Sequence, residues 1–419
     1  MTDPTIAVLY DRGAASVGEI SVGLAGLGTI VFLVADSAHT RRVAPLLAEL
    51  GRVVPLTGDR PADLDRVRAL APAAVLTFSE PMLPAAAWLA ASLGLPGHPV
   101  AATGWLTNKI RQRERLSAAS VDQVRSRPVR SVVRWPAVRD FVGLPAVIKP
   151  VYGEGSRNTH VVRDDAAARN LLATLDAEVV VEELLVGRPS APFGDYVSVE
   201  SLCGPRGIHH IAVTGKFPLA PPFRETGRFW PAAIPAADHA VVTDLVTRAL
   251  HALEVGVGLT HTEVKLTEAG PRIIEVNGRL GGHVNGLARQ ACGIDLVRLA
   301  GRLALGQDPD PPAEPARLDR VCFQHNTLAP VLACELVAIH GADRVRASRR
   351  VDGFRCYARP GDVFAADVMT RHIDLLWGAC DDHAELPLVL DDALRELSYD
   401  FGFTDGVRRV AAADLQRGG

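Results

Sequence analysis

The sequence predicts an α/β fold divided into several domains, with a parallel sheet near the N-terminus and mixed helices and strands after it. Three observations support this prediction. A chain of 419 residues has room for two or three domains of about 150 residues each. Its first hundred residues alternate short apolar runs with stretches rich in Ala and Leu, which is typical of parallel strands joined by helical crossovers. Residues 306–315 are rich in Pro and Asp, as linkers between domains are.

The first domain, predicted over residues 1–100, follows from apolar runs that are each followed by a helical stretch. The expected strands cover residues 6–11, 29–36, 52–56 and 74–80, and the expected helices lie near residues 16–27, 40–50, 61–70 and 83–93. Gly23, Gly26 and Gly28 lack the strand-to-helix order of a dinucleotide-binding fingerprint. We therefore expect them to mark a helix end and a turn.

The second domain is predicted over residues 101–305. Its expected helices cover residues 108–116, 237–254 and 294–305, and its expected strands cover residues 146–150, 178–183, 195–203, 261–267 and 271–277. The last two strands are joined by Glu-Ala-Gly as a hairpin. The third domain, predicted over residues 306–419, begins with the linker and continues with β-rich runs such as residues 353–357.

The composition excludes several classes of protein. The 45 Lys and Arg residues against 48 Asp and Glu give a net charge of −3, so charge gives no reason to expect nucleic-acid binding. The 22% charged fraction and 48% hydrophobic fraction exclude a disordered chain. The apolar, uncharged run of residues 20–35 is interrupted by glycines and is shorter than the ~18 residues of a membrane helix, and the N-terminus does not resemble a signal peptide. We expect a cytoplasmic protein that binds no membrane.

Lysine is almost absent from this chain. The 45 basic residues include only Lys109, Lys149, Lys216 and Lys265, and the remainder are arginines. GC-rich codon usage explains such a bias wherever Arg is tolerated. The four remaining lysines are then expected at positions where an arginine would not serve, and all of them lie within the second domain.

The first motif joins a strand to a loop rich in Gly and Ser. Lys149 ends the apolar run of residues 146–150, and the loop of residues 153–157 follows it. A cation beside closely approaching backbone N–H groups suits a polyphosphate. The loop is not a Walker A motif, because no Gly-Lys-Ser/Thr follows the glycines. A turn that carries a surface lysine is the alternative interpretation.

The second motif is an apolar strand that ends on two acids before a Leu-Leu pair, Glu182-Glu183-Leu184-Leu185. Backbone and carboxylate acceptors beside apolar side chains could receive the amino group and the ring of adenine. A solvated strand end is the alternative interpretation.

The third motif is a pair of neighbouring strands with polar side chains on one face. Glu275 and Asn277 point to one side of their strand because side chains alternate, and the apolar Ile274 and Val276 point to the other. Glu263 on the preceding strand would lie across from them and complete an all-oxygen set, which suits Mg²⁺ shared with phosphates. Buried acids need such a cation to offset the cost of burial. A purely structural role is the less favoured alternative.

These segments together occur in the order and approximate spacing of the ATP-grasp superfamily, which the chain resembles over essentially its whole length. Within that superfamily the sequence is most similar to carboxylate–amine ligases that make dipeptides, the L-amino-acid ligases. The stretches that carry this likeness are residues 195–200 (DYVSVE), 215–218 (GKFP), 223–228 (FRETGR), 260–266 (THTEVKL) and 275–283 (EVNGRLGGH).

The resemblance implies an α/β (α+β) ATP-grasp fold with a Rossmann-like pre-grasp domain, a central two-lobed grasp domain and a β-rich C-terminal domain. It also implies ATP as a substrate and Mg²⁺ as a cofactor, with two ions expected and Mn²⁺ able to substitute. Glu263, Glu275 and Asn277 match the metal ligands of the superfamily.

The expected ATP-binding residues, which follow from the same resemblance, are Lys109, Lys149, Gly153, Gly155, Ser156, Glu182, Glu183, Leu185 and Asp195. The lysines and the loop would contact the phosphates, and the residues around the strand end would hold adenine. The acid that usually binds the ribose is replaced here by Pro189, so Asp195 is the candidate for that contact.

The resemblance also implies catalytic and substrate-binding residues. Arg279 matches the arginine that steadies the acyl-phosphate and the tetrahedral intermediate, and Lys216 would reach the terminal phosphate unless it is a surface lysine. Glu225 and Arg228 match positions that line the amino-acid pocket. His283 stands where relatives often have a bulky aromatic residue, so it predicts a more polar pocket, or else a histidine that only packs. Lys265 has no predicted role.

The resemblance therefore implies an ATP-dependent ligase that joins two small molecules, a carboxylate and an amine, through an acyl-phosphate. Dipeptide formation is the first expectation, and a role in antibiotic biosynthesis and a homodimer are expected by analogy. Two alternatives remain open: a ligase or carboxylase for a carboxylate that is not an amino acid, and a nucleotide-binding regulator without turnover.

Overall fold

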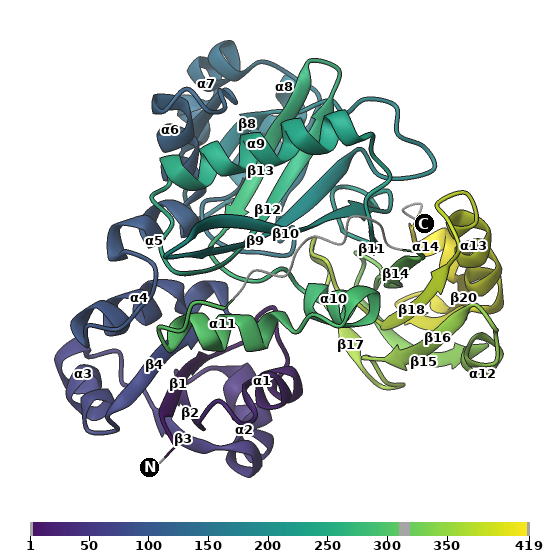
Figure 1. Ribbon diagram of the computed structural model, residues 1–419. Coiled ribbons are helices and arrows are strands. Elements are labelled where there is room, and N and C mark those ends of the chain that lie inside the picture. The colour runs from purple at the N-terminus through teal and green to yellow at the C-terminus, as the bar shows by residue number, and fades with distance from the viewer. Residues whose placement is uncertain (1–2, 310–318, 417–419) are drawn as a thin grey trace.

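The computed structural model describes residues 3–309 and 319–416 of the chain. Most of the predicted linker, residues 306–315, falls outside the described part. In Figure 1 the N-terminal unit lies at the lower left, a unit of long strands lies above it, and the C-terminal unit lies at the right. The mixed α/β character that the sequence predicts is confirmed.

The N-terminal sheet is parallel, as predicted. In strand order β3-β2-β1-β4 it contains β1 (Thr5–Tyr10), β2 (Thr29–Val34), β3 (Arg52–Pro55) and β4 (Pro72–Thr77). The helices of this unit are α1 (Val17–Leu24), α2 (Ala38–Leu50), α3 (Arg60–Arg68), the short 3-10 helix η1 (Glu80–Met82) and α4 (Leu83–Ser92). Ser16 begins α1 with a capping box that it shares with Glu19.

A small antiparallel sheet follows, led by α5 (Val100–Thr107) and α6 (Lys109–Ala118). In strand order β5-β8-β6-β7 it contains β5 (Ser126–Val129), β6 (Ala146–Pro150), β7 (His160–Val162) and β8 (Val179–Glu183). The helices of this unit are η2 (Val132–Arg134), α7 (Trp135–Val142) and α8 (Asp165–Ala173). Trp135 packs with Ile148 and Val181 in their common core. The predicted strands at residues 146–150 and 178–183 are confirmed.

The large sheet has eight strands within the described residues, in the order β13-β12-β9-β10-β11-β14-β18-β16. These strands are β9 (Tyr196–Gly204), β10 (Gly207–Lys216), β11 (Gly227–Trp230), β12 (Gly258–Thr267), β13 (Gly270–Asn277), β14 (Val321–His325), β16 (Val351–Cys356) and β18 (Asp374–Cys380). The helix α9 (Ala236–Ala252) crosses this unit in Figure 1, and α10 (Val284–Cys292) and α11 (Leu296–Ala304) follow the sheet's edge strand β13. The predicted hairpin is confirmed, whereas β10, β11 and α10 were not predicted.

The C-terminal unit adds a second antiparallel sheet of order β17-β15-β19-β20. Its elements are β15 (Cys334–His340), α12 (Ala342–Arg346), β17 (Val363–Phe364), α13 (Leu386–Glu396), β19 (Ser398–Phe403), β20 (Gly406–Ala411) and α14 (Ala412–Gln416). The large sheet thus contains strands from both sides of the predicted boundary near residue 306. The domain boundaries themselves remain predictions.

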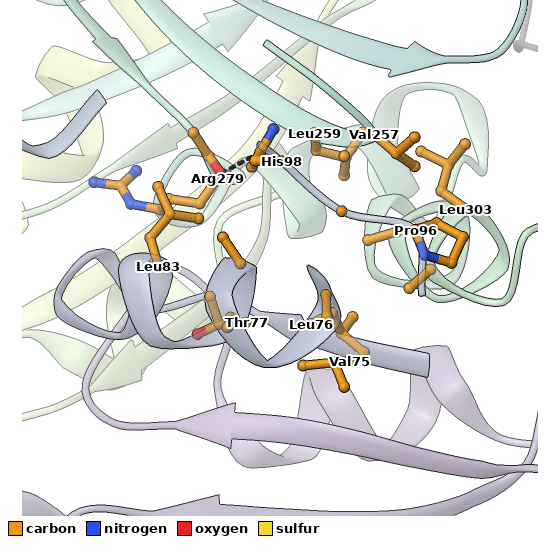
Figure 2. Close-up of a pocket in the computed structure, with 18 of the residues that line it drawn as sticks. Val75, Leu76, Thr77, Leu83, Pro96, His98, Val257, Leu259, Arg279 and Leu303 are labelled. Carbon is orange, nitrogen blue, oxygen red and sulfur yellow. Dashed lines mark hydrogen bonds between the residues drawn. The ribbon is translucent and has the colours of Figure 1, made fainter. Parts of the chain in front are cut away.

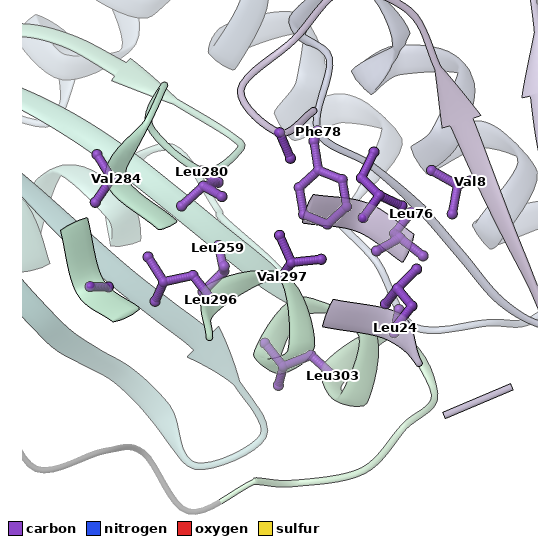
Figure 3. Packing of buried hydrophobic residues seen from close by; sticks show 14 of the residues in the cluster. Val8, Leu24, Leu76, Phe78, Leu259, Leu280, Val284, Leu296, Val297 and Leu303 are labelled. Atoms are coloured by element: carbon purple, nitrogen blue, oxygen red, sulfur yellow. The ribbon is translucent and has the colours of Figure 1, made fainter. Parts of the chain in front are cut away.

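Helix α11 packs the N-terminal unit against the large sheet. Figure 3 shows Leu296, Val297 and Leu303 of this helix in one buried apolar cluster with Leu24 and Leu259. Helices α1 and α11 approach so closely that a Cβ at Gly301 of α11 would lie 2.4 Å from Cδ2 of Leu24 of α1. This contact fixes the N-terminal unit beside the end of β13.

A cavity of ≈ 60 Å³ lies between the N-terminal unit and the large sheet. Figure 2 shows it lined mostly by apolar side chains, with His98 and Arg279 on its wall. The Nε2 atom of His98 is 3.0 Å from the carbonyl oxygen of Gly278.

Among the helices of the described residues, none is long and apolar enough to span a membrane.

Candidate active site

Lys149 ends β6 and meets a buried carboxylate on β8. Its Nζ lies 2.8 Å from Oε2 of Glu182, and Arg113 from α6 donates to both oxygens of the same carboxylate at 2.9 and 3.0 Å. Burial alone would raise the pKa of Glu182, but Arg113 and Lys149 outweigh it and lower the pKa to about 2. The predicted phosphate lysine is therefore held by the first acid of the predicted adenine motif.

Lys109 connects the glycine-rich loop to β13. Asn108 caps α6 and so fixes the start of this helix, and Lys109 Nζ lies 2.7 Å from the oxygen of Gly153 and 2.6 Å from Oε1 of Glu275. In the loop, Gly153, Gly155 and Ser156 all have left-handed φ angles, of 124°, 66° and 55°. The structure brings the two phosphate lysines, the loop and the acids of β13 together.

The same loop contacts the C-terminal unit. The N–H of Asn158 donates to the oxygen of Val368 at 2.7 Å, and the N–H of Thr370 donates to the oxygen of Gly155 at 2.8 Å. Ser156 Oγ donates to the oxygen of Phe223 at 2.7 Å. Hydrogen bonds thus connect the loop to residues 223, 368 and 370, for which the sequence predicted no contact with it.

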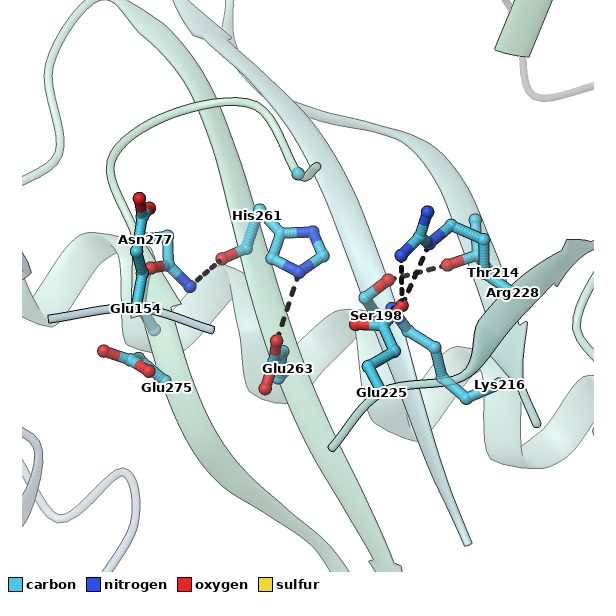
Figure 4. Close-up of polar contacts among 12 residues, drawn as sticks. Glu154, Ser198, Thr214, Lys216, Glu225, Arg228, His261, Glu263, Glu275 and Asn277 are labelled. Carbon is cyan, nitrogen blue, oxygen red and sulfur yellow. Dashed lines mark hydrogen bonds and ion pairs between the residues drawn. The ribbon is translucent and has the colours of Figure 1, made fainter. Parts of the chain in front are cut away.

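The predicted metal ligands meet across the hairpin. Glu263 on β12 pairs in register with Glu275 on β13, and His261 pairs with Asn277. Figure 4 shows Glu275 and Asn277 beside Glu154 of the glycine-rich loop, with Glu263 next to them below His261. The cross-strand pairing predicted for Glu263 and Glu275 is confirmed.

Two carboxylates and one amide oxygen on a single face fit a hard divalent cation that completes its shell with phosphate oxygens. In residues 3–309 and 319–416, no group of three or more His, Cys, Asp or Glu side chains is arranged to hold a metal by itself. Instead, Lys109 neutralises Glu275, and His261 Nε2 lies 3.4 Å from Oε1 of Glu263. The donor set therefore fits Mg²⁺ shared with a nucleotide.

His261 and Glu200 form a buried pair that sequence reasoning missed. His261 Nδ1 contacts Oε1 of Glu200 on the adjacent strand β9, where the two residues are register partners. Burial would lower the pKa of His261, but Glu200 and Glu263 outweigh it and raise the pKa to about 9. The charged imidazole fixes the orientation of Glu263.

Arg279 follows β13, and its guanidinium contacts four other residues. Its Nη2 lies 3.1 Å from Oε2 of Glu154 and 3.3 Å from Oδ1 of Asn277, and its Nη1 donates to the oxygen of Leu280 at 3.0 Å. Its Nε lies 3.2 Å from Oε2 of Glu80, which belongs to the N-terminal unit. The predicted catalytic arginine therefore lies beside the predicted metal ligands.

Glu225, Arg228 and Lys216 form one cluster at the other end of the polar face (Figure 4). Arg228 donates to Oε1 of Glu225 through Nε at 2.9 Å and through Nη2 at 2.5 Å, and Lys216 Nζ reaches the same oxygen at 3.1 Å. Lys216 is only 1% exposed, so the interpretation as a surface lysine is wrong. Burial would raise the pKa of Glu225, but the two cations hold it below its ordinary value.

His283 begins α10 with a left-handed φ of 62°. Its Nδ1 lies 3.4 Å from the hydroxyl of Tyr357, and its ring centroid is 5.3 Å from that of His372. Burial lowers the pKa of His283 well below its ordinary value, with a further contribution from Arg228. The C-terminal unit thus provides two polar neighbours of His283, and the effect of His283 on the substrate pocket stays a prediction.

The remaining residues of the predicted adenine and ribose sites have partners as well. Glu183 accepts from the N–H of Arg125 at 2.9 Å, and Leu185 is half-buried just after β8. Asp195 lies 2.6 Å from Nζ of Lys265, which gives that lysine a partner that the sequence did not indicate.

Every lysine of the chain is paired with a carboxylate. The pairs are Lys109–Glu275, Lys149–Glu182, Lys216–Glu225 and Lys265–Asp195. The expectation that an arginine would not serve at these four positions stays a prediction.

Sequence reasoning did not single out five charged residues of this site, namely Glu80, Arg113, Glu154, Glu200 and His261. Glu154 lies inside the quoted loop and Arg113 inside the basic stretch of α6, so each was in a segment already marked. Glu200 and His261 lie inside the stretches 195–200 and 260–266 that resemble the ligases, whereas Glu80 lies far from the motifs in sequence.

Comparisons with known proteins place this chain among related sequences and folds. Residues 142–286 match a family model described as an ATP-grasp domain. The protein y4rH of Sinorhizobium fredii is 32% identical over 64% of this chain and 56% of its own length. Carnosine synthase 1 of Gallus gallus is 28% identical over 62% of this chain and 30% of its own length.

Alanine–anticapsin ligase of Bacillus subtilis is 24% identical over 57% of this chain and 55% of its own length. The matches thus span about half, or less, of the length of these relatives. Among solved structures, an L-amino acid ligase from Bacillus licheniformis superposes with a TM-score of 0.77 at 21% identity, over 95% of this chain and 99% of that one. These matches show that residues 142–286 are similar to an ATP-grasp domain and that the chain has the fold of the L-amino acid ligase.

Proposed function

We propose that the chain is an ATP-dependent carboxylate–amine ligase that forms an amide bond between amino acids or amino-acid-like substrates and releases ADP and phosphate. The observation that carries this proposal is the single polar face on which Glu263, Glu275 and Asn277 adjoin Arg279 and Lys109. Two of the relatives support it, since their names describe an alanine–anticapsin ligase and a carnosine synthase.

In this proposal a substrate carboxylate attacks the γ-phosphate of ATP, and an amine then displaces phosphate from the acyl-phosphate. Lys109 and Lys149 contact the nucleotide phosphates, with the loop of Gly153, Gly155 and Ser156 closing over them. Arg279 offers a planar, two-toothed donor to the acyl-phosphate and to the tetrahedral intermediate. The chain contributes mainly positioning and charge, as in other phosphoryl transfers.

Glu263, Glu275 and Asn277 would hold Mg²⁺, and we propose two ions, with Mn²⁺ able to substitute. A bound ion would supply neutralisation of phosphate charge. Glu182, Glu183 and Leu185 would surround adenine, and Asp195 would bind the ribose. The carboxylate of Glu182 is already bound by Arg113 and Lys149.

The cluster around Glu225 fits an amino-acid substrate. All of its contacts with Arg228 and Lys216 end on Oε1, so Oε2 is the oxygen for a substrate ammonium group. Arg228 keeps a buried Nη1 without a hydrogen-bond partner among the described residues, and a substrate carboxylate would satisfy it. Lys216 would reach the terminal phosphate from this cluster, and His283 would limit the side chain that fits.

We also propose a homodimer in the cytoplasm, and a role in antibiotic biosynthesis, by analogy with the L-amino-acid ligases. These parts of the proposal rest on the resemblance and not on the geometry of the site.

The test is a screen of amino-acid pairs with ATP and Mg²⁺, in which products are identified by mass spectrometry and ADP release is measured. Glu275→Ala should abolish ADP release, and chelation of the divalent ion should do the same. Glu268→Ala, an exposed acid in the turn of the same hairpin, is the matched control and should leave ADP release unchanged.

Unchanged turnover in Glu275→Ala would contradict the metal site. ATP binding without ADP release for any pair would overturn the ligase proposal in favour of a regulator. Turnover only with carboxylates that are not amino acids, or with bicarbonate, would change the substrate class.

A further inference from the structure

Glu80 is a buried acid that the proposed reaction does not use. It begins η1 just after β4, at the carboxyl edge of the parallel sheet, and only 6% of its surface is exposed. Its Oε2 lies 3.2 Å from Nε of Arg279, across the boundary between the N-terminal unit and the large sheet. A carboxylate in such a place is costly to bury without a cation beside it.

The backbone that carries Glu80 is held firmly. Ser79 Oγ donates to the oxygen of Arg12 at 2.7 Å, and the N–H of Ala14 donates to the oxygen of Phe78 at 2.8 Å. A Cβ at Gly13 would lie 2.3 Å from that same oxygen of Phe78, so the two segments are in direct contact. Glu80 is therefore attached to a rigid edge of the sheet.

Arg279 has a second acidic partner, which lies on a different kind of element. Glu154 belongs to the glycine-rich loop, and its side chain is 34% exposed, against 8% for Glu80. Phosphate groups that enter beneath the loop would compete with Glu154 for Nη2 of Arg279. The contact with Glu80 is at Nε, on a different donor of the guanidinium, and it can persist while Nη2 changes partners.

We infer that Glu80 is a positioning residue for Arg279, which keeps the guanidinium oriented toward the acyl-phosphate while the loop exchanges partners. The inference rests on the proposed function. Within the described part of the chain, neither Oε2 of Glu80 nor Nε of Arg279 has a well-aligned hydrogen bond, although the two atoms are close. Contacts of this kind are often poorly aligned before substrates bind and tighten in the reacting complex.

The groups around Glu80 act on its charge in opposite directions. Burial raises its pKa to about 7 although Arg279 and Lys109 act to lower it, and Glu275 and Glu154 add to the rise. A phosphate group bound at this site would add negative charge beside the guanidinium of Arg279. The carboxylate that keeps the arginine in place then comes from the N-terminal unit, which otherwise provides none of the predicted site residues.

The test compares Glu80→Ala and Glu80→Gln with the wild type in steady-state ADP release. We expect kcat to fall about 10–100-fold in Glu80→Ala, as for other residues that orient a reacting group, while the KM for ATP stays unchanged. Glu80→Gln keeps the shape and one acceptor oxygen, so it should recover part of kcat. Asp63→Asn is the matched control, since Asp63 is a buried acid of the same unit whose partners are Thr57 and Gly58.

A double-mutant cycle separates positioning from general stability. If Glu80 acts through Arg279, adding Glu80→Ala to Arg279→Ala should lower kcat no further. Additive losses, or an unchanged kcat in Glu80→Ala, would overturn the inference. A thermal melt of each variant checks folding, and Glu80→Gln provides the comparison if the alanine variant does not fold.

A second measurement keeps this inference apart from the proposed function. If no substrate pair gives ADP release in the wild type, the ligase proposal fails. The rate at which phenylglyoxal modifies Arg279, followed by peptide mass spectrometry, then tests the contact alone. We expect a rate several-fold higher in Glu80→Ala than in the wild type, and equal rates would overturn the role of Glu80.

Discussion

Replacing Arg113 with methionine should destabilise the protein strongly, because Arg113 joins three elements by buried polar contacts. From α6 it binds Glu182 on β8 through two donors, and it donates to the oxygens of Ile273 and Ile274 on β13 at 2.6 and 2.8 Å. The side chains of Arg113 and Glu182 are each 5% exposed. Methionine would fill much of the space but provide none of these donors.

The magnitude follows from this burial. Removal of one partner from a buried ion pair costs about 3–5 kcal/mol, because the remaining charge is left in a poorly solvated site. Lys149 still contacts Glu182, which favours the lower end of that range. Since about 1 kcal/mol shifts Tm by roughly 2–4 °C in a unit of this size, we expect a fall in Tm of about 6 °C or more.

The measurement is thermal unfolding of the purified protein, with Arg115→Met as the matched control on the same helix. Arg115 pairs with Glu254 at 2.5 Å, and both side chains are substantially exposed, at 38% and 53%. Exposed pairs contribute about 0–1 kcal/mol, so the control should melt close to the wild type. Equal shifts for the two variants would refute the reasoning that burial decides the cost.

Three further changes have expected outcomes. Lys149→Arg should nearly abolish ADP release, because a guanidinium cannot replace a compact ammonium group in this buried position, and near-normal activity would contradict this. Asp374→Asn tests the pH dependence of stability. Burial raises the pKa of Asp374 to about 6, above the ~3.9 of an unfolded chain. The protonated side chain therefore contributes to stability below about pH 4, and this contribution is lost as the pH rises through 6. The variant should show a smaller fall in Tm between pH 4 and pH 7 than the wild type, and identical slopes would contradict the shift. Gly187→Ala should lower the free energy of unfolding by about 1–3 kcal/mol, because the new Cβ would lie 1.8 Å from Oδ2 of Asp195. Gly18→Ala is the control: it has open space around it and should stabilise helix α1 by about 0.5–1 kcal/mol. Equal melting temperatures of these two variants would contradict the contact at Gly187.

Much of the fold could be predicted because its signals are local. The strands of the N-terminal sheet are mostly apolar runs, and the hairpin of β12 and β13 is set by a turn of two residues, Glu268 and Ala269. The pairing of Glu263 with Glu275 follows from that hairpin. For the same reason, the predicted metal ligands needed no knowledge of the remote parts of the chain.

Contacts between remote segments could not be predicted in this way. Arg113 and Glu182 are 69 residues apart, and neither periodicity nor a motif connects them. Glu80 meets Arg279 only because α11 packs the N-terminal unit against the large sheet. The partners of His283 come from the C-terminal unit, whose β-rich runs indicated strands but not their neighbours.

The continuous large sheet limits how this protein can be divided or recombined. β11 pairs with β14, so a chain cut near residue 306 would leave the Gly227–Trp230 strand as an open edge with unpaired backbone groups. Such edges promote aggregation, and here Phe229 and Trp230 would also lose their covering. The C-terminal unit is therefore not an exchangeable module, and chimaeras with related ligases should retain β11, β14 and β18 from a single parent.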